Sequence, residues 1–344
     1  MAYVMIIAGL VLLFVGGEVL VRGSVGVARK FGLSELLIGI VLVGFGTSMP
    51  ELVTSLQAVG QGAVGMSVGN VAGSNIANIM LVLGAAALIR PIMTDPRALS
   101  RDFMVMVIAT AVFLAVAYFD VFTRVAGIGM LILLTVYIVA SFFLDKNNAE
   151  TAALHTEEGE LIETNDAFAL SCVFTLAGIA GVVIGANLLV NGGVVVATRF
   201  GVSDTLIGLS IVAVGTSLPE LATSIVSAMK GKSDVALGNV IGSNIFNLLG
   251  IIGVTAAVLP FSLGSSINSA TGMDDVGAVF SRQSADLGSN LTWTDVSALM
   301  LSVFFVILFA FSGKQLARWE GGVLLVSYFV FMGMAFNIIP TPFA

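Results

Sequence analysis

Charged residues are scarce in this chain. Asp, Glu, Lys and Arg make up 10% of its 344 residues, whereas a soluble globular protein has about 25%. Hydrophobic residues account for 58% of the chain, and the mean hydropathy is +1.07. Apolar stretches of about twenty residues are long enough to cross a hydrocarbon core of about 30 Å as helices. The composition excludes a soluble enzyme and a nucleic-acid-binding protein, and it predicts a polytopic membrane protein.

Cysteine and histidine each occur only once. Cys172 lies in an apolar run and has no second cysteine to pair with, which excludes a disulfide-stapled secreted domain. His155 lies in a charged segment, so the chain offers no Cys/His metal cluster and little basis for a histidine-based triad. We therefore expect no cofactor and no enzymatic activity. The N-terminus also lacks a basic region before its apolar run, so we expect it to remain as a first transmembrane helix.

Hydropathy and loop signals predict ten transmembrane helices, five on each side of a polar acidic segment. We interpret residues 1–144 and 167–344 as two five-helix domains, and 145–166 as an acidic cytoplasmic loop. Because five is an odd number, two homologous halves would insert with opposite orientations. The expected spans lie near 2–21, 34–60, 64–89, 102–120, 124–144, 167–191, 204–229, 234–259, 294–312 and 318–339.

Positive charge gathers on one side of this layout. Eleven of the fourteen Lys and Arg residues fall in one set of loops, and only Arg124, Arg199 and Arg282 fall in the other. The positive-inside rule predicts that the first set faces the cytoplasm, with both termini outside. We expect a multi-pass protein of the inner (plasma) membrane. Glu18, in the first span, is expected to pair with Arg22 one turn away.

The two halves are related in sequence. A shift of 169 residues aligns 15–91 with 184–260 without a gap, and roughly two in five positions are identical, which marks an internal repeat. Shared helix composition alone would not keep Gly, Pro, Asn and Glu at one offset. The repeated segments, about 34–89 and 204–259, predict an all-α membrane protein built from two inverted-topology repeats.

The best-matched motif places a glutamate in the middle of a hydrophobic span in each half. It is Gly-Thr-Ser-Met-Pro-Glu at 46–51 and Gly-Thr-Ser-Leu-Pro-Glu at 215–220. A carboxylate at this depth costs about 2.5 kcal/mol or more on insertion scales, and no Lys or Arg lies nearby to pair with it. Equivalent depths in inverted repeats would bring Glu51 and Glu220 together near the midplane. Two facing carboxylates without a basic partner are candidate cation ligands.

Proline beside each glutamate supports an ion site. Pro50 and Pro219 cannot donate a backbone hydrogen bond, so they free carbonyl groups close to the acid. Irregular backbone at membrane depth is tolerated where it lines a cavity or an ion site. The freed carbonyls and the neighbouring hydroxyls are hard oxygen ligands, which suit Ca²⁺ or Na⁺. The alternative is a proline-kinked structural helix with two paired neutral acids.

A second repeated motif places polar residues on one face of a helix. Asn70, Ser74 and Asn78 are spaced four apart and share a face. The GxxxG spacing beside them lets another helix approach to backbone contact. We interpret these helices as packed against the broken ones, with their polar face toward the same ions. The same arrangement recurs at Asn239, Ser243 and Asn247.

Together, the two motifs resemble the α-repeats of the cation/Ca²⁺ exchanger superfamily, in its prokaryotic Na⁺/Ca²⁺ exchanger branch. The resemblance covers both repeats and the ten-span layout. It implies that Ca²⁺ is exchanged for Na⁺ by alternating access, with four ion sites around the paired glutamates, broken helices at the sites and no cofactor. It also implies a ligand set of Glu51, Glu220, the carbonyls of Thr47 and Thr216, Ser48, Ser74, Ser217, Ser243, Asn78, Asn247, and backbone oxygens near Gly44 and Ala213.

Alternative couplings and a channel stay open at this point. Exchangers that resemble this chain and depend on K⁺ carry Asp at the position of Asn247, so K⁺ co-transport is less expected. The H⁺/Ca²⁺ branch usually has a different glutamate motif, so proton coupling is also less favoured. A cation channel would use carboxylates too, but inverted repeats with broken midplane helices favour a transporter. The expected partners are the two ions and the lipid bilayer; a monomer should suffice for transport, and the oligomeric state is open.

Overall fold

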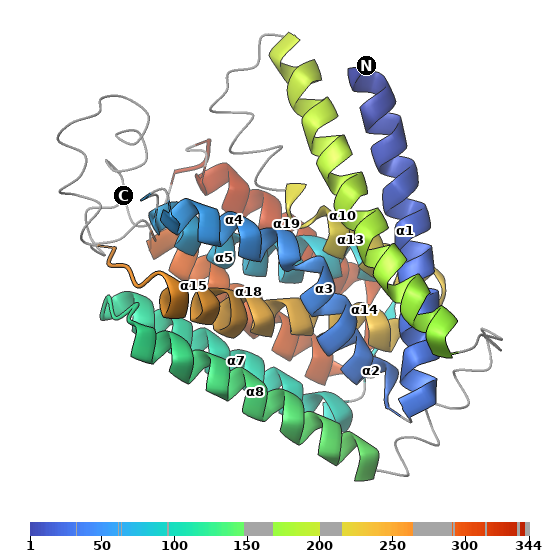
Figure 1. Ribbon diagram of the computed structural model, residues 1–344, viewed down its shortest axis with the longest axis horizontal. Coiled ribbons are helices and arrows are strands. Elements are labelled where there is room, and N and C mark those ends of the chain that lie inside the picture. Colours follow the sequence, from blue (N-terminus) through green and yellow to red (C-terminus); the bar gives the residue numbers. More distant parts are fainter. Residues whose placement is uncertain are drawn as a thin grey trace.

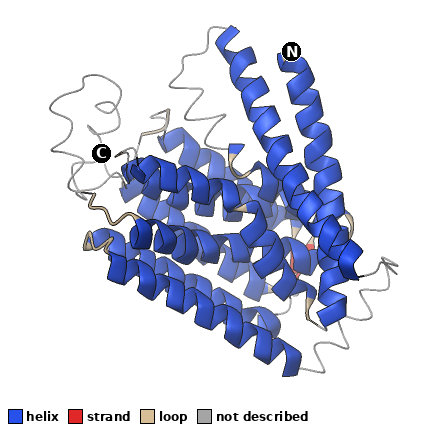
Figure 2. Cartoon of the chain, in the orientation of Figure 1, coloured by secondary structure: helices blue, strands red, loops and turns tan. Residues whose placement is uncertain are grey.

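The structure is a computed structural model, and it is almost entirely helical where it is described (Figures 1 and 2). Seven helices in that part of the chain are long and apolar enough to cross a membrane, or eight if a bent pair counts as one span. The prediction of a multi-pass helical membrane protein is confirmed, while the count of ten spans stays a prediction. The described residues are 1–31, 33–60, 62, 64–94, 96–147, 168–199, 215–263, 291, 293–313, 315–335 and 338–340.

The first helix of each half is longer than predicted. Helix α1 covers Ala2–Phe31 and helix α10 covers Phe168–Arg199, where the sequence indicated spans ending near 21 and 191. Helix α1 continues through Arg22, whose guanidinium lies 5.1 Å from the ring centroid of Phe174 on α10. A long basic side chain can reach an aromatic face in this way without ending the helix.

Helices α1 and α10 pack against each other through glycine, and their upper parts extend beyond the other helices in Figure 1. A Cβ atom added at Gly16 would lie 2.8 Å from the backbone nitrogen of Val182. One added at Gly185, the repeat counterpart of Gly16, would lie 2.7 Å from the nitrogen of Leu13. Real Cβ atoms do not approach this closely, so the two backbones are in direct contact, as small residues allow in membranes.

The second span is bent at the predicted motif. Helix α2 (Glu35–Ile38), a wider π-helical segment η1 (Gly39–Gly44) and helix α3 (Phe45–Thr47) lead to helix α4 (Met49–Gly60), at an angle of 44°. The bend is at Ser48, with φ −86° and ψ 8°, and Ser217 has nearly the same conformation, φ −86° and ψ 3°, before helix α13 (Leu218–Met229). Pro50, two residues later, explains the bend at Ser48, and Pro219 stands at the same distance from Ser217.

The irregular backbone segment in the second span is shorter than the sequence indicated. The nitrogen of Ser48 donates to Gly44 O at 3.2 Å, and the nitrogen of Leu52 donates to Ser48 O at 3.3 Å. The span therefore bends without unwinding over several residues. Residues 204–214, where the seventh span was expected to begin, lie outside the described residues.

The third span of each half forms the buried centre. One consists of helix α5 (Val64–Ile76), the π-helical segment η2 (Ala77–Leu83) and helix α6 (Gly84–Ile89). The other consists of helix α14 (Ser233–Ile245), η5 (Phe246–Ile251) and helix α15 (Ile252–Val258). The π-helical turns, which often mark functional sites, begin at equivalent positions, and they contain Asn78 and Asn247. Most of each span is buried, 72% and 89% of the respective apolar windows.

The remaining helices surround this centre and interlock the halves. They are α7 (Pro96–Tyr118), α8 (Arg124–Asn147), α18 (Trp293–Ser312) and α19 (Arg318–Ala335). A Cβ at Gly127 of α8 would lie 2.6 Å from Gly253 O of α15, and one at Gly321 of α19 would lie 2.7 Å from Gly84 O of α6. The last helix of each half thus packs on the third span of the other half. A short antiparallel ladder joins strands β1 (Ile92–Met93) and β2 (Gln315–Leu316).

Candidate ion-binding site

Glu51 and Glu220 occupy equivalent positions, three residues after Ser48 and Ser217. Each is in the first turn of its helix, α4 or α13, and each is fully buried. The hydroxyl of Ser48, in the first half, donates to Glu220 Oε1 at 2.8 Å, so the motif of one half contacts the acid of the other. The positive ends of helices α4 and α13 favour negative charge at these positions.

Several buried polar atoms of the predicted ligand residues lack a hydrogen-bond partner within the described part of the chain. Burying a polar group without a partner is costly, and native proteins keep few of them. Cations fit as the missing partners of the oxygens in this set. The atoms are both carboxylate oxygens of Glu51, Oε2 of Glu220, the side-chain amides of Asn78 and Asn247, and the hydroxyls of Thr216 and Ser217.

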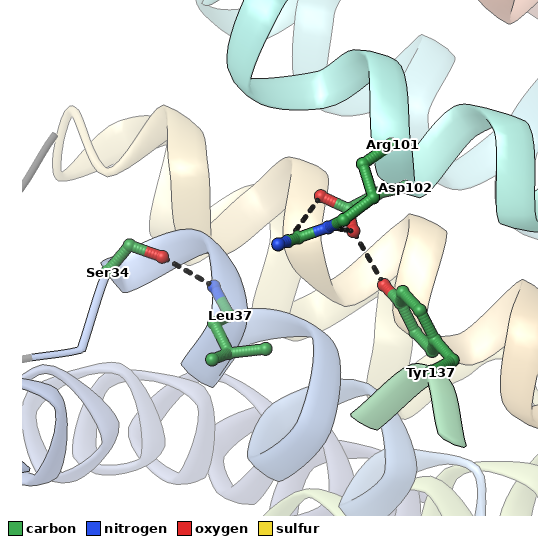
Figure 3. A network of polar contacts seen from close by, with 5 residues as sticks. All are labelled: Ser34, Leu37, Arg101, Asp102 and Tyr137. Atoms are coloured by element: carbon green, nitrogen blue, oxygen red, sulfur yellow. Dashed lines mark hydrogen bonds and ion pairs between the residues drawn. The ribbon is translucent and has the colours of Figure 1, made fainter. Parts of the chain in front are cut away.

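Asp102 of α7 shows how a buried acid is satisfied elsewhere in the molecule. It is fully buried, and its Oδ1 accepts hydrogen bonds from Tyr137 Oη at 2.8 Å and Arg101 Nε at 2.9 Å (Figure 3). Arg101 also donates to Oδ2 at 3.2 Å. The sequence placed Asp102 at the start of a span, and only the structure brings Tyr137 from α8 to meet it. This acid is neutralised by the protein itself.

Two further buried acids are also satisfied. Lys232 Nζ lies 2.9 Å from Glu35 Oε1. Glu320 accepts from the hydroxyl of Ser312 at 3.0 Å and from the nitrogen of Ala317 at 2.7 Å. Among the buried acids that the structure describes, the pair at the bends therefore stands out, because it has no basic partner and few donors.

Asn239 and Asn70 hold the glutamate-bearing helices in place. The amide Nδ2 of Asn239 donates to Glu220 O at 3.2 Å and to the hydroxyl of Ser224 at 2.9 Å. The sequence placed both asparagines on the face that meets the ions, but their amides bind helix backbone, and the serine partners were not identified. Ser55 and Ser224 recur at the repeat offset of 169 residues, and this was the signal in the sequence that could have identified them as partners. In the first half, Asn70 Nδ2 likewise contacts Glu51 O at 3.4 Å and Ser55 Oγ at 3.2 Å.

The other expected ligands lie around the bends. Ser243 Oγ donates to Gly44 O at 3.1 Å, and Thr47 Oγ1 lies 3.2 Å from Asn239 Oδ1. The hydroxyl of Thr47 also lies near Glu220, as that of Thr216 does near Glu51. Ser74 is 4% exposed on α5, one turn before Asn78. Ala213 lies outside the described residues.

The donor set consists of hard oxygens. No group of three or more His, Cys, Asp or Glu side chains is clustered in the described ranges. The site instead combines two carboxylates with neutral amide, hydroxyl and carbonyl oxygens, a set that suits Na⁺ and Ca²⁺.

This fold and site define the chain as a multi-pass membrane transporter rather than an enzyme. Residues 1–143 and 170–337 match the family model described as sodium/calcium exchanger protein. The chain belongs to the sodium/calcium exchanger family, whose members are secondary transporters.

Relatives of similar length support this assignment. The sodium/calcium exchanger MaX1 of Methanosarcina acetivorans is 32% identical over 375 residues, covering 98% of this chain and 99% of the relative. The inner membrane protein YrbG of Escherichia coli is 30% identical over 343 residues, covering 99% and 98%. A solved structure of the sodium-calcium exchanger NCX_Mj superposes with a TM-score of 0.76 at 29% identity, over 97% of each chain. The resemblance expected from the two motifs is thus confirmed.

Proposed function

We propose that this protein exchanges Ca²⁺ for Na⁺ across the membrane by alternating access, with the ions held between Glu51 and Glu220. The observation that carries the proposal is the buried pair of carboxylates whose oxygens have few donors in the described chain. The names of MaX1 and NCX_Mj, both sodium/calcium exchangers, support the choice of ions.

The ligands would come equally from the two halves. Glu51 and Glu220 bind Ca²⁺, assisted by the carbonyls of Thr47 and Thr216 and by the neutral side chains around the bends. Ser48 already contacts the acid of the opposite half, which supports a site that both halves share. The remaining ligands in this proposal are Ser48, Ser74, Ser217, Ser243, Asn78, Asn247, and backbone oxygens near Gly44 and Ala213.

Contacts repeated at an offset of 169 residues support ten spans in two inverted repeats. Asn70 and Asn239 make the same pair of contacts in their own halves. The glycines at 16 and 185 meet the opposite helix in the same way. Two homologous halves with such matching contacts are related by a pseudo-twofold axis, the arrangement that alternating access uses. In this layout the end that carries Lys230 and Lys232 is cytoplasmic, and both termini are outside.

Charge explains why the two ions would exchange. One Ca²⁺ or a set of Na⁺ ions neutralises the two glutamates, and both loads need the same oxygens. An unloaded site would leave two like charges buried close together, which is unfavourable in a low-dielectric interior. The site should therefore reorient when loaded, which couples the movement of one ion to that of the other.

Ca²⁺ uptake into Na⁺-loaded vesicles tests this function. Vesicles that contain the purified protein should take up Ca²⁺ only when an outward Na⁺ gradient is present. A proton gradient or added K⁺ should not replace that Na⁺ gradient. Glu51→Gln and Glu220→Gln should each abolish exchange, because either change removes half of the site's charge. Glu18→Gln is the matched control, since that carboxylate is 52% exposed and lies outside the site. Uptake that ignores the Na⁺ gradient would favour a channel, and full activity in Glu51→Gln would remove the proposed site.

A further inference from the structure

The bent span of the first half packs tightly against the third span of the second half. A Cβ at Gly238 of α14 would lie 2.5 Å from Leu36 O of α2, and one at Gly44 would lie 2.8 Å from the nitrogen of Ser243. The contact continues to the bend, where Thr47 Oγ1 lies 3.2 Å from Asn239 Oδ1. We call this contact, between residues 35–47 and α14, the inner seam. In alternating access, contacts between the two halves must open to give the ions a path to one side, and the inner seam is such a contact toward the basic end of the molecule.

A buried ion pair joins the two helices at the basic end of the inner seam. Lys232 Nζ lies 2.9 Å from Glu35 Oε1, and the two side chains are only 3% and 9% exposed. Lys232 directly precedes α14, and Glu35 begins α2 after Ser34, whose hydroxyl caps the helix by accepting from the nitrogen of Leu37 at 3.1 Å (Figure 3). Separating the helices would leave each of the two charges without its partner in a buried, poorly solvated environment, which is strongly unfavourable.

The repeat lacks an equivalent pair. In the sequence, Asp204 is the counterpart of Glu35, but Ala63 is the counterpart of Lys232. Neither counterpart lies within the described residues, and the alanine has no charge to contribute. Alternating access in an inverted repeat exchanges the conformations of the two halves, so identical halves would favour neither orientation. A buried ion pair that joins the halves at one of the two repeat-related contacts, and has no charged counterpart at the other, must bias that equilibrium.

We propose that the Glu35–Lys232 pair is a lock that keeps the basic, cytoplasmic end of the ion pathway closed and makes the outward-facing state the resting state. The inference rests on the alternating access proposed above. Both residues act through the position of α2 and α14, and neither touches the ions. The lock would give the exchanger unequal apparent affinities at its two faces, because a ligand binds weakly at the face that is rarely open.

The half-saturating Ca²⁺ concentration at each membrane face tests the lock. The double variant Glu35→Gln with Lys232→Met removes both charges and keeps similar volumes, so neither residue leaves an unpaired charge. Its half-saturating concentration at the cytoplasmic face should fall, by about tenfold if the pair shifts the equilibrium by that factor, and the value at the outer face should rise. A general loss of folding would weaken both faces together and would not produce opposite changes.

Two controls complete the experiment. The reversed pair, Glu35→Lys with Lys232→Glu, should restore the wild-type difference between the faces. Glu18 and Lys230 form a second ion pair at the same end, at 2.8 Å, but their side chains are 52% and 28% exposed. Because exposed pairs contribute little, Glu18→Gln with Lys230→Met should leave both faces nearly unchanged.

The outcomes separate the lock from the transport function. Na⁺-dependent exchange with unchanged half-saturation at both faces of the Glu35→Gln, Lys232→Met variant would overturn the lock and leave the function standing. Absence of Na⁺-dependent Ca²⁺ flux in the wild-type protein would overturn the function itself. Hydrogen exchange of the backbone amides at 35–44 gives an independent readout, because it should accelerate in the unlocked variant and return to wild-type rates in the reversed pair.

Discussion

At the residue scale, the candidate site is distinguished by which buried polar atoms have hydrogen-bond partners and which have none among the described residues. Asn239 illustrates the first kind, because its amide contacts Glu220 O and Ser224 Oγ while its oxygen lies beside the hydroxyl of Thr47. Asn247 illustrates the second kind, since neither end of its amide has a partner among the described residues. The two asparagines have the same chemistry and lie on the same buried span, so only their surroundings distinguish a positioning residue from a candidate ligand.

Asn239→Leu should weaken ion binding as well as stability. Leucine cannot donate to Glu220 O or Ser224 Oγ, and leaving such acceptors unsatisfied costs about 1–3 kcal/mol. The half-saturating Ca²⁺ concentration should rise about tenfold for each 1.4 kcal/mol by which the substitution destabilises the Ca²⁺-bound state. Flux measurements alongside thermal unfolding would detect both effects.

Asn244→Leu is the control for this change. Asn244 is on the same helix and 1% exposed, but its amide donates to Val240 O of its own helix, at 2.7 Å. This variant should lose stability without a change in half-saturating Ca²⁺. Equal effects of the two variants on Ca²⁺ binding would contradict a positioning role for Asn239.

At the element scale, close helix packing depends on glycine at a few positions. Helices α1 and α10 are largely apolar and have large hydrophobic side chains exposed along much of their length. In lipid there is no hydrophobic driving force that pairs two such helices, so their association must depend on van der Waals contact between closely packed backbones. Gly16 and Gly185 provide that contact at equivalent places in the repeat.

Gly185→Ala should separate α1 from α10. The added methyl group would lie 2.7 Å from the nitrogen of Leu13 and 2.9 Å from Gly9 O, both backbone atoms that cannot move aside. Overpacking of this kind costs about 1–3 kcal/mol, which should appear as a lower unfolding temperature in detergent. Gly129→Ala on α8 is the control, because no described atom lies within 4 Å of its added Cβ. A similar loss in both variants would show that helix α1 does not depend on this contact.

At the scale of the whole molecule, the halves are interlocked rather than side by side. Helix α8 of the first half packs on α15 of the second, and α19 of the second packs on α6 of the first. The bent span of the first half packs on α14 in the same crossed manner. These crossed contacts join the two repeats, so a movement of the bent span can be transmitted directly to the other half.

Sidedness is the property of the whole molecule that labelling can test. In a Cys172→Ser background, a cysteine at Phe119, which is 69% exposed, should react with a membrane-impermeant maleimide added outside intact cells. Gly313 is exposed and directly follows the C-terminal end of α18. A cysteine at this position should react only after the membrane is permeabilised. The reverse pattern would invert the proposed orientation, and the lock would then close the outer end.

The sequence by itself determined the membrane class and the internal repeat, and it predicted that the two glutamates pair. These follow from local properties: apolar length, a constant offset of 169 residues, and an acid beside proline where no basic residue is near. The position of the bend at Ser48 could also be predicted, because a proline distorts the helix in which it lies.

Only the tertiary structure decided which polar groups meet. Ser48 contacts Glu220 from 172 residues away, Tyr137 contacts Asp102, and Lys232 contacts Glu35 across 197 residues. Periodicity places a residue on a face of its helix but does not say which helix that face meets. Close packing of the interlocked halves settles that question, and it alone separates the buried acids that have donors or a basic partner from the two that have few donors and no basic partner among the described residues.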